Sequence, residues 1–591
     1  MSKRYNEYKQ LDLPAIADEI LEFWEANDIF QKSIDTREGH EPFVFYEGPP
    51  SANGMPGIHH VMARTIKDIF CRYRTLKGFQ VKRKAGWDTH GLPIELGVEK
   101  ELGITKEDIG KTITIAEYND ACRKAVMKYT DVWNDLTRKI GYWVDMDHPY
   151  VTYDNKYIES VWWLLKNLFD KGLLYKGYTI QPYSPKAGTG LSSHELNQPG
   201  TYRDVKDTTV VAQFRAPSLD EKFGGETHII AWTTTPWTLP SNTALAVGEK
   251  IDYVAVQTFN QYTFKPVVVV LAKELVSKWF KAENAELSFE DYNDGDKNIP
   301  FQVVSEFKGS ELIGTKYEQL MPYAQPDGDG FRVIAGDFVS TEDGTGIVHI
   351  APTFGADDAR VAKVAGIGAM LLDDGEGNQV PLVDLQGRFR KEVTDFAGEY
   401  VKSEYYTEEE IAEQTQKQGR DNYLSVDERI AIKLKEENKA FRVERYVHGY
   451  PHCWRTDKPI LYYPLDSWFV RTTDAKDRLI ELNKTINWKP ESTGTGRFGN
   501  WLENLQDWNL SRSRFWGIPL PIWSTEDKKQ RKCIGSAEEL KEECEKAVAA
   551  GLMKSNPLAD FKPGNMDASN YDVFDLHRPY MDDVILVSDS G

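Results

Sequence analysis

The segment from residue 43 to residue 87 changes its periodicity three times, and this alternation restricts the fold more than any other feature of the chain. An apolar run, FVFY (43–46), precedes the turn-forming EGPPSANGMPG (47–57). Apolar residues then recur at helical spacing from Ile58 to Lys77, before a second strand pattern, FQVKRKAGW (79–87). Strand, turn, helix and strand form a βαβ unit, which predicts a parallel sheet with a right-handed crossover. Because ligands of such sheets bind beyond the carboxyl ends of the strands, we expect the turn 47–57 and the run 86–95 at one rim.

The remaining sequence predicts further segments of different character. A chain of 591 residues exceeds one hydrophobic core. From about residue 200, short β-rich runs separated by turns predict a barrel-like inserted domain. We therefore expect an α/β protein with four parts: a helical extension (1–40), the first part of a parallel-sheet domain (41–199), the insertion (200–440), and a return to the first domain (441–591) with a polar insertion at about 523–575.

Charge and cysteine content exclude some classes of protein. The chain has 72 basic and 92 acidic residues, a net charge of −20, which argues against a generally basic surface for nonspecific nucleic-acid binding. The basic stretch from Arg64 to Lys84 favours a solvated helix face. Five scattered cysteines fit a reducing cytoplasm, and no apolar run approaches the ~20 residues of a membrane span. We expect a cytoplasmic protein, without a membrane partner.

Two short stretches carry candidate chemistry for the rim. A Gly/Pro-rich turn before a helix favours a phosphate at the helix start, where His59 and His60 could donate to its oxygens. No GxxxxGK[ST] run is present, so P-loop binding is not predicted. In GWDTHGLPIE (86–95), Asp88 follows a strand and its carboxylate suits an ammonium group. Taken alone, a histidine pair more often caps a helix, and an Asp in a turn is usually structural.

Together, GPPSANG and GWDTHGLPIE resemble the class I aminoacyl-tRNA synthetases, and among them the isoleucine branch. SRSRFWGIPLPIW (511–523) and AWTTTPWTLPSN (231–242) agree, and the resemblance covers essentially the whole chain. It implies a Rossmann-type catalytic domain that joins L-isoleucine to ATP with Mg²⁺, releases pyrophosphate and transfers the acyl group to tRNA(Ile). His59, His60 and Asp88 would be catalytic, with Asp88 on the substrate ammonium. The implied substrate and adenylate positions are Gly48, Pro49, Pro50, Asn53, Gly54, Gly57, Gly86, Trp87, His90, Gly91 and Trp516.

The sequence departs from the family at its HxGH signature, which maps onto Gly57-Ile58-His59-His60. Only His60 matches, because Gly57 replaces the first histidine and His59 occupies the usual glycine. Either His59 substitutes from a shifted position, or phosphate stabilisation depends on His60 and backbone amides.

The insertion carries a second implied site. Isoleucine and valine differ by one methylene, the standard example of limited selectivity in an apolar pocket, so a second pocket hydrolyses the smaller product. The resemblance places Asp358 on the amino group and His349 near the terminal ribose. The implied wall consists of Thr233, Thr235, Thr238 and Asn242, with Thr234 in the same cluster. A Thr-rich strand by itself most often reflects β propensity.

Two features of the family are missing from the sequence. Paired CxxC knuckles that bind zinc in many relatives correspond here to Ser184-Pro185-Lys186-Ala187 and Cys453-Trp454-Arg455-Thr456. One cysteine cannot build a tetrahedral site, so we expect no zinc. No KMSKS-like run follows SRSRFWG, so we expect a partial chain with an incomplete catalytic domain and weak or absent adenylate formation.

Three other interpretations stay open at this point. An editing-only hydrolase of mischarged tRNA is disfavoured by the synthesis motifs in residues 40–100. An inactive tRNA-binding paralogue is supported by Gly57 but not by the retained Asp358. Another nucleotidyltransferase is disfavoured by the β-rich insertion. In each case we expect a monomer.

Overall fold

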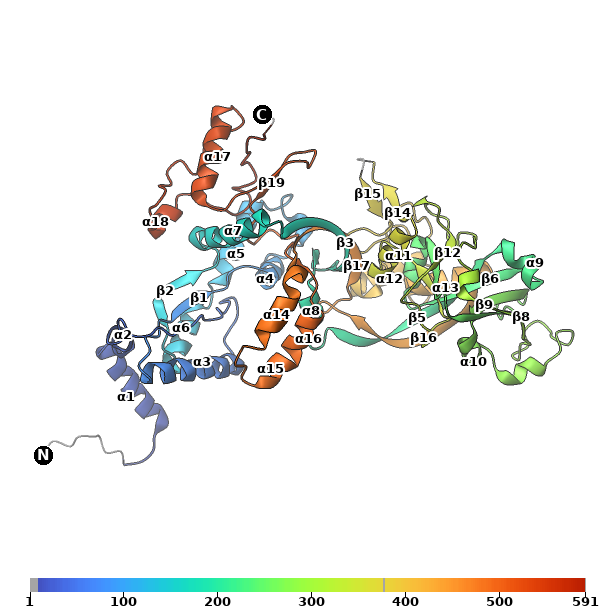
Figure 1. The fold of residues 1–591 in the computed structure, drawn as a ribbon, viewed down its shortest axis with the longest axis horizontal. Coiled ribbons are helices and arrows are strands. Elements are labelled where there is room, and N and C mark those ends of the chain that lie inside the picture. The colour runs from blue at the N-terminus through green and yellow to red at the C-terminus, as the bar shows by residue number, and fades with distance from the viewer. Residues whose placement is uncertain (1–8, 376–377, 590–591) are drawn as a thin grey trace. The chain divides into compact units, whose positions relative to one another are not determined.

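The computed structural model describes residues 9–375 and 378–589, which form two compact units. The first unit contains the residues up to Leu174 together with those from Arg514 onward, and the second contains Tyr175–Ser513 (Figure 1). Helices occur with both parallel and antiparallel strand pairs, which confirms the predicted α/β class. The predicted domain boundaries remain predictions, because compact packing alone does not define a functional domain.

The first unit is mainly helical. Its helices are α1 (Leu13–Ala26), α2 (Ile29–Asp35), α3 (Ile58–Leu76), α4 (Leu92–Leu102), α5 (Ile115–Val126), α6 (Thr130–Lys139), α7 (Asn155–Asp170), α17 (Ala537–Ala549) and α18 (Ala568–Tyr571). The helix α3 begins and ends within one residue of the predicted bounds. Leu540 and Cys544 of α17 pack against Ile158 and Trp162 of α7, so the segment predicted as a polar insertion contributes to a core.

The parallel pairing predicted for the first unit is present, but between different strands. The strand β1 (Lys84–Trp87) pairs in parallel with β2 (Asp145–Val151), and Trp87 lies opposite Val151. The strand predicted at 43–46 is wrong: this segment has only an isolated parallel bridge, Pro42 to Gln80, at its start. A strand needs a continuous ladder, and the side chains of Val44 and Tyr46 are exposed instead.

The face of α3 that packs against the protein differs from the predicted one. The buried side chains are Arg64, Cys71 and Thr75, whereas the apolar series from Ile58 to Leu76 is largely exposed. The basic stretch is therefore only partly a solvated face. The guanidinium of Arg64 lies over the ring of Trp133, 5.1 Å from its centroid, and Arg83 is buried. Cation–π contacts of this kind lower the cost of burying the charge.

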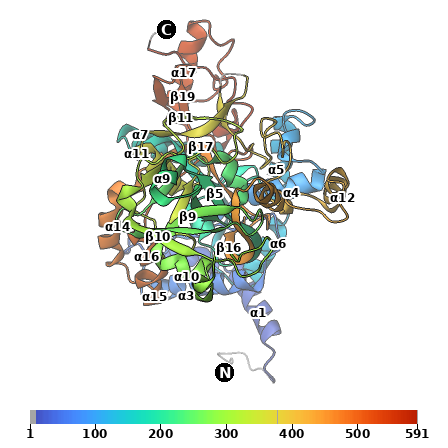
Figure 2. The same cartoon turned by 90° about the vertical axis from the view of Figure 1, so that its right-hand side faces the viewer.

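The second unit is β-rich, as predicted for the insertion. Its main sheet has the order β10-β8-β9-β6-β5-β16, and Figure 2 presents several of these strands toward the viewer. The strands are β5 (Tyr202–Arg215), β6 (Thr227–Thr233), β8 (Asp252–Phe259), β9 (Pro266–Ala272), β10 (Gln302–Lys308) and β16 (Ala440–Pro451). Alternate inward residues such as Val210, Ala212 and Phe214 build the core on one face of β5.

Smaller sheets and short helices complete the second unit. One sheet contains β12 (Arg332–Ala335), β7 (Ala244–Val247) and β13 (Ile347–Ile350), a second contains β11 (Pro326–Gly328), β14 (Ile367–Asp373) and β15 (Gln379–Pro381), and a third contains β18 (Trp508–Asn509), β17 (Leu461–Val470), β3 (Leu174–Ser184) and β4 (Thr189–Gly190). The helices that concern the site are η3 (Pro236–Ser241), α11 (Ala356–Val364), η7 (Ser403–Tyr405), α12 (Glu408–Lys417) and α13 (Val426–Glu436).

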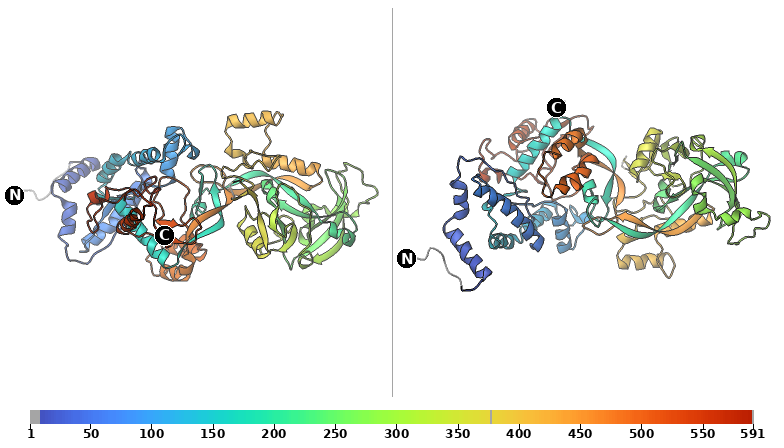
Figure 3. Two further views of the ribbon diagram at one scale, coloured as in Figure 1. Left: turned by 90° about the horizontal axis from the view of Figure 1, so that it is seen from above. Right: turned by 60° about the horizontal axis from the view of Figure 1, so that its bottom comes forward.

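Two long strands dominate the second unit in Figure 3. The strands β5 and β16 run side by side and antiparallel, from the pair Tyr202 and Pro451 to the pair Ala212 and Ala440. The helix α13 packs against β5 and η3 through an apolar face that includes Ile430 and Leu434. Within the described residues, no helix is both long enough and apolar enough to cross a membrane.

Candidate functional site

The turn 47–57 and the run 86–95 meet at one rim of the first unit, as the sequence predicted. The N–H of Asp88 donates to the carbonyl of Pro50 at 2.9 Å. The far side of the turn is fixed by the indole N–H of Trp133, which donates to the carbonyl of Gly54 at 2.9 Å. The turn is therefore tied both to the end of β1 and to α6, close to the start of α3.

His60 caps the helix α3 and keeps one donor for a ligand. Its Nδ1 accepts the N–H of Gly57 at 2.9 Å, so the neutral ring carries its proton on Nε2. Burial, followed by the charges of His59 and Arg64, lowers the pKa of His60. Nε2 is thus a neutral donor beside the first N–H groups of the helix, which lack intrahelical acceptors.

The departure from HxGH has a geometric explanation. A Cβ built on Gly57 would lie 2.8 Å from Cε1 of His59, closer than real Cβ contacts allow. The rings of His59 and His60 are adjacent, with their centroids 3.8 Å apart. His59 therefore occupies the space beside residue 57, and a side chain at 57 would have to displace the exposed ring of His59.

Asp88 is available to a ligand. The residue is exposed at the rim, and its carboxylate forms no ion pair with any residue in the described ranges, although burial of the carboxyl group raises its pKa and a backbone hydrogen bond from His90 opposes that rise. Gly86, two residues earlier, is required by packing, because a Cβ there would lie 2.3 Å from the ring of Tyr150. That ring in turn donates its hydroxyl to the carbonyl of Glu47 at 2.8 Å. The positions Gly48, Pro49, Asn53, Trp87 and Gly91 belong to these same two segments, and their individual roles stay predictions.

Trp516 and His90 lie in a buried polar chain that the sequence analysis did not find. Trp516 is 1% exposed, and its indole N–H donates to the carbonyl of Thr89 at 2.6 Å. Nε2 of His90 lies 2.9 Å from Nε2 of His577, whose Nδ1 lies 2.6 Å from a carboxylate oxygen of Asp575. Burial, and after it His577, lowers the pKa of His90 to about 3, so His90 is neutral at pH 7. No local spacing relates residue 90 to residue 577, so the sequence patterns could not predict this network of hydrogen bonds.

A buried ion-pair network joins GWDTHGLPIE to SRSRFWG. Glu95 lies at the end of the first motif, and its Oε2 accepts a hydrogen bond from Nε of Arg514 at 2.8 Å. Its other oxygen accepts the backbone N–H groups of Phe515 and Trp516, each at 3.0 Å. Arg514 also pairs with Glu99, and its side chain is 5% exposed while that of Glu95 is 0% exposed. The two sequence motifs are therefore held together by one buried network of ion pairs and hydrogen bonds.

In the second unit, three of the four predicted threonines lie together, and one of them, Thr238, contacts His349. Oγ1 of Thr235 lies 3.4 Å from that of Thr233 and 3.5 Å from that of Thr238. Thr234 follows the end of β6 and makes no side-chain hydrogen bond to another described residue. Asn242 is used internally, since its Oδ1 accepts the hydroxyl of Tyr317 at 2.7 Å.

Nδ1 of His349 is a buried acceptor that no described residue satisfies. Oγ1 of Thr238 donates to the carbonyl of Thr235 at 2.9 Å and lies 3.0 Å from Nε2 of His349. Since that hydroxyl has one proton, Nε2 of His349 donates to it, and Nδ1 is left as the acceptor. Burial lowers the pKa of His349 to about 4, and Nδ1 has no hydrogen-bond partner among the described residues. An unpaired buried acceptor is costly, which points to a ligand or water at this position.

Asp358 supplies the negative charge of the same region. It lies in the first turn of α11, where its Oδ2 accepts the N–H of Ala351 at 2.8 Å. Gly355 permits this approach, because a Cβ there would lie 2.6 Å from Cγ of Asp358. Burial raises the pKa of Asp358 to about 6. The carboxylate is thus partly desolvated, which strengthens its attraction for a cationic group.

The residues at the knuckle positions do not fit zinc. The N–H of Ala187 donates to Oγ of Ser184 at 3.2 Å, and the carbonyl of Cys453 accepts the N–H of Asp457 at 2.9 Å. Their hydrogen bonds hold tight turns, but the four positions supply one thiol and no imidazole. The described part of the chain contains no group of three or more His, Cys, Asp or Glu side chains placed to hold a metal ion.

The chain belongs to the class I tRNA synthetases: residues 19–577 match the family described as tRNA synthetases class I (I, L, M and V). Among individual relatives, it is 66% identical over 588 residues to the isoleucine–tRNA ligase of Cytophaga hutchinsonii and 62% identical over 611 residues to that of Bacteroides fragilis. Both alignments cover 100% of this chain but 51% and 53% of the relatives. The chain therefore spans about half the length of the curated relatives it matches.

Similarity to solved structures is weaker. The ternary complex of Agrobacterium radiobacter LeuRS with tRNA and LeuAMS aligns with 90% of this chain and 53% of that chain, at 15% sequence identity and a TM-score of 0.34.

Proposed function

We propose that the first unit activates L-isoleucine with ATP and Mg²⁺ for transfer to tRNA(Ile). The observation that carries this proposal is the carboxylate of Asp88, which has no ion-pair partner among the described residues and whose backbone N–H is bonded to Pro50 in the turn before α3. Identities of 60–66% to proteins named isoleucine–tRNA ligase, over the whole chain, support the substrate. They also disfavour an editing-only hydrolase or an inactive paralogue.

The geometry supports a division of roles at the rim. Asp88 binds the substrate ammonium, which leaves the isoleucine carboxylate free to attack the α-phosphorus of ATP while pyrophosphate leaves. Nε2 of His60, the N–H groups at the start of α3, and His59 in the space beside Gly57 then face the developing negative charge on the phosphate. Donors that are fixed before the reaction need no reorganisation during it.

Isoleucine binding tests the role of Asp88. Titration calorimetry with isoleucine and with a non-hydrolysable isoleucyl-adenylate analogue should show binding to the chain and its loss in Asp88→Ala. Asp147→Ala, an exposed aspartate on the neighbouring strand β2, is the matched control and should bind normally. Unchanged binding by Asp88→Ala would refute the assignment. Isoleucine-dependent pyrophosphate exchange by the same proteins tests the chemical step.

A second activity is favoured by the unpaired Nδ1 of His349. We propose that the second unit hydrolyses valyl-tRNA(Ile). Asp358 would bind the valyl ammonium, and Nδ1 of His349 would accept a proton from the water or the terminal ribose hydroxyl. Water adds to the ester carbonyl, the ester C–O bond breaks, valine leaves as its carboxylate, and the ribose oxygen takes up a proton. The hydroxyls of Thr235 and Thr238 orient the attacking water.

Deacylation of valyl-tRNA(Ile) tests this second activity. His349→Ala and Asp358→Ala should each abolish most of the hydrolysis, while Asp88→Ala should leave it unchanged because the two sites lie in different units. Equal loss of hydrolysis in Asp88→Ala would contradict the division of labour. His228→Ala is a matched control, since this buried histidine also lies in the β-rich unit but pairs with Glu226.

A further inference from the structure

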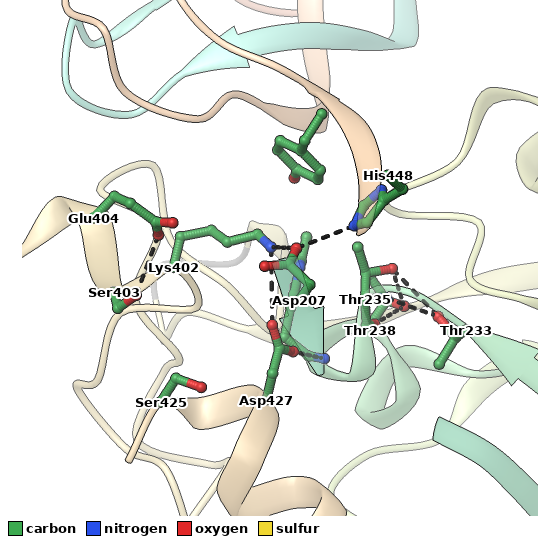
Figure 4. Close-up of polar contacts among 12 residues, drawn as sticks. Asp207, Thr233, Thr235, Thr238, Lys402, Ser403, Glu404, Ser425, Asp427 and His448 are labelled. Carbon is green, nitrogen blue, oxygen red and sulfur yellow. Dashed lines mark hydrogen bonds and ion pairs between the residues drawn. The ribbon is translucent and has the colours of Figure 1, made fainter. Parts of the chain in front are cut away.

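A buried lysine between two aspartates lies beside the threonine turn (Figure 4). Nζ of Lys402 is 3.1 Å from Oδ2 of Asp207 and 3.8 Å from Oδ2 of Asp427, and its side chain is 5% exposed. The ammonium also lies 4.5 Å from the ring centroid of Tyr450, and Nε2 of His448 lies 3.3 Å from Asp207. Desolvation makes such interior charges expensive, and apolar residues would often stabilise the fold as well. The cluster therefore calls for an explanation other than stability.

The second carboxylate of the cluster reaches the backbone of the threonine turn. Oδ1 of Asp427 accepts the N–H of Trp237 at 2.8 Å. This N–H lies in the first turn of η3, where helical backbone donors lack an intrahelical acceptor. Trp237 stands between Thr235 and Thr238, and Thr238 contacts His349. One carboxylate from α13 thus fixes the backbone that presents both hydroxyls.

The same hydrogen bond also helps to place the segment that carries Asp358, because Trp237 packs against that segment. The ring of Trp237 packs edge-on against that of Phe354, with 4.9 Å between the centroids. Phe354 directly precedes Gly355 and the helix that presents Asp358. A displaced Trp237 would therefore disturb the threonine turn and the ammonium-binding carboxylate together.

We propose that Asp427, held by Lys402, is a positioning residue for the hydrolytic site. The inference rests on the proposed hydrolysis of valyl-tRNA. Asp427 does not touch the substrate; the hydrogen bond that its Oδ1 accepts from the N–H of Trp237 sets the orientation of Thr235 and Thr238 against His349. Burial raises the pKa of Asp427 to about 7 and the charge of Lys402 opposes this rise, so the carboxyl is ionised mainly above pH 7, while its Oδ1 accepts the N–H of Trp237.

Steady-state deacylation of valyl-tRNA by the full chain tests the inference. Asp427→Ala should lower kcat by about tenfold or more while KM changes little, because Asp358 is intact and misplacement of orienting groups affects the chemical step. Asp427→Asn keeps an oxygen for Trp237 and leaves the ion pair of Lys402 with Asp207 in place, so it should retain most of the activity. Arg429→Met is the matched control: it breaks the 2.5 Å ion pair of α13 with Glu399 and should leave kcat unchanged.

Two further measurements separate positioning from loss of structure. Thr238→Val and Asp427→Ala should be non-additive in kcat, because both act through the same turn. Amide hydrogen exchange at Trp237 should become faster in Asp427→Ala and stay slow in Asp427→Asn. An active wild-type chain with an equally active Asp427→Ala would overturn the inference alone. A wild-type chain without deacylation would instead refute the proposed hydrolysis, and the inference with it.

Discussion

Replacing Arg514 by methionine should destabilise the first unit by about 3–5 kcal/mol, the cost of leaving buried charges without their partner. Glu95 is fully buried and Glu99 nearly so, and both bind this one guanidinium. Methionine fills the volume of the side chain but leaves two carboxylates facing each other. With a urea m value of about 3 kcal/mol/M, the unfolding midpoint would fall by about 1–1.7 M.

Hydrogen exchange during a urea titration measures this effect in the first unit alone, if peptides that span α4 are followed. Burial already raises the pKa of Glu99 while Arg514 is present, and removal of the cation raises it further. A carboxyl group whose pKa is raised in the folded state makes the fold less stable as the pH rises. The destabilisation caused by Arg514→Met should therefore shrink when the pH is lowered from 8 to 5. A pH-independent loss would indicate lost packing instead.

The matched control for Arg514 is Arg138→Met. Arg138 pairs with Glu25 at 2.9 Å, but its side chain is 56% exposed, so the expected loss is below about 1 kcal/mol. A loss below about 1 kcal/mol for Arg514→Met, or losses of equal size for both variants, would refute the reasoning that burial decides the energy of these pairs.

Three further predictions concern the histidines and the thiols. Gly57→His should weaken binding of the isoleucyl-adenylate analogue, because the new side chain must displace the ring of His59, and adding His59→Gly should restore it; equal binding by the single and double variants would contradict this displacement. Burial lowers the folded-state pKa of His349 to about 4, so stability present above pH 6.5 is lost as the pH falls toward 4, by about 3 kcal/mol. Urea midpoints of the second unit should show this loss in the wild type and not in His349→Gln. All five cysteines are buried and reduced, so a thiol reagent should label the native chain slowly and the urea-unfolded chain at once; fast native labelling would contradict their burial.

Sequence reasoning worked where the determinants are local. Helical spacing after the Gly/Pro-rich turn located α3. A shared rim followed from the strand and turn patterns, and the hydrogen bond from Asp88 to Pro50 agrees with it. The strand expected at 43–46 failed because a strand depends on a partner that local sequence does not specify. The prediction that the apolar face of α3 is buried failed for the same reason, because burial depends on which elements pack against the helix.

The polar networks were beyond the sequence because their members are far apart in the chain. His90 and His577 are separated by 487 residues, and Asp427 and Trp237 by 190. Neither pair has a spacing that a helix or a strand would repeat. Asp427 in particular resembles an ordinary acidic residue in the first turn of a helix, where a carboxylate is favoured by the helix dipole alone. Only the fold shows that it accepts a hydrogen bond from another helix.

The pairing of β5 with β16 has a consequence for how such a protein can be rearranged. Tyr202 and Pro451 lie opposite each other in the ladder, so their Cα atoms are about 5 Å apart although their residue numbers differ by 249. The polypeptide thus enters and leaves the segment 202–451 at two neighbouring positions. Everything between could be excised as a cassette and replaced by a turn of a few residues, or circularly permuted at this point, without stretching the remaining backbone. Gain, loss or exchange of a whole module then needs only two adjacent joints in the polypeptide.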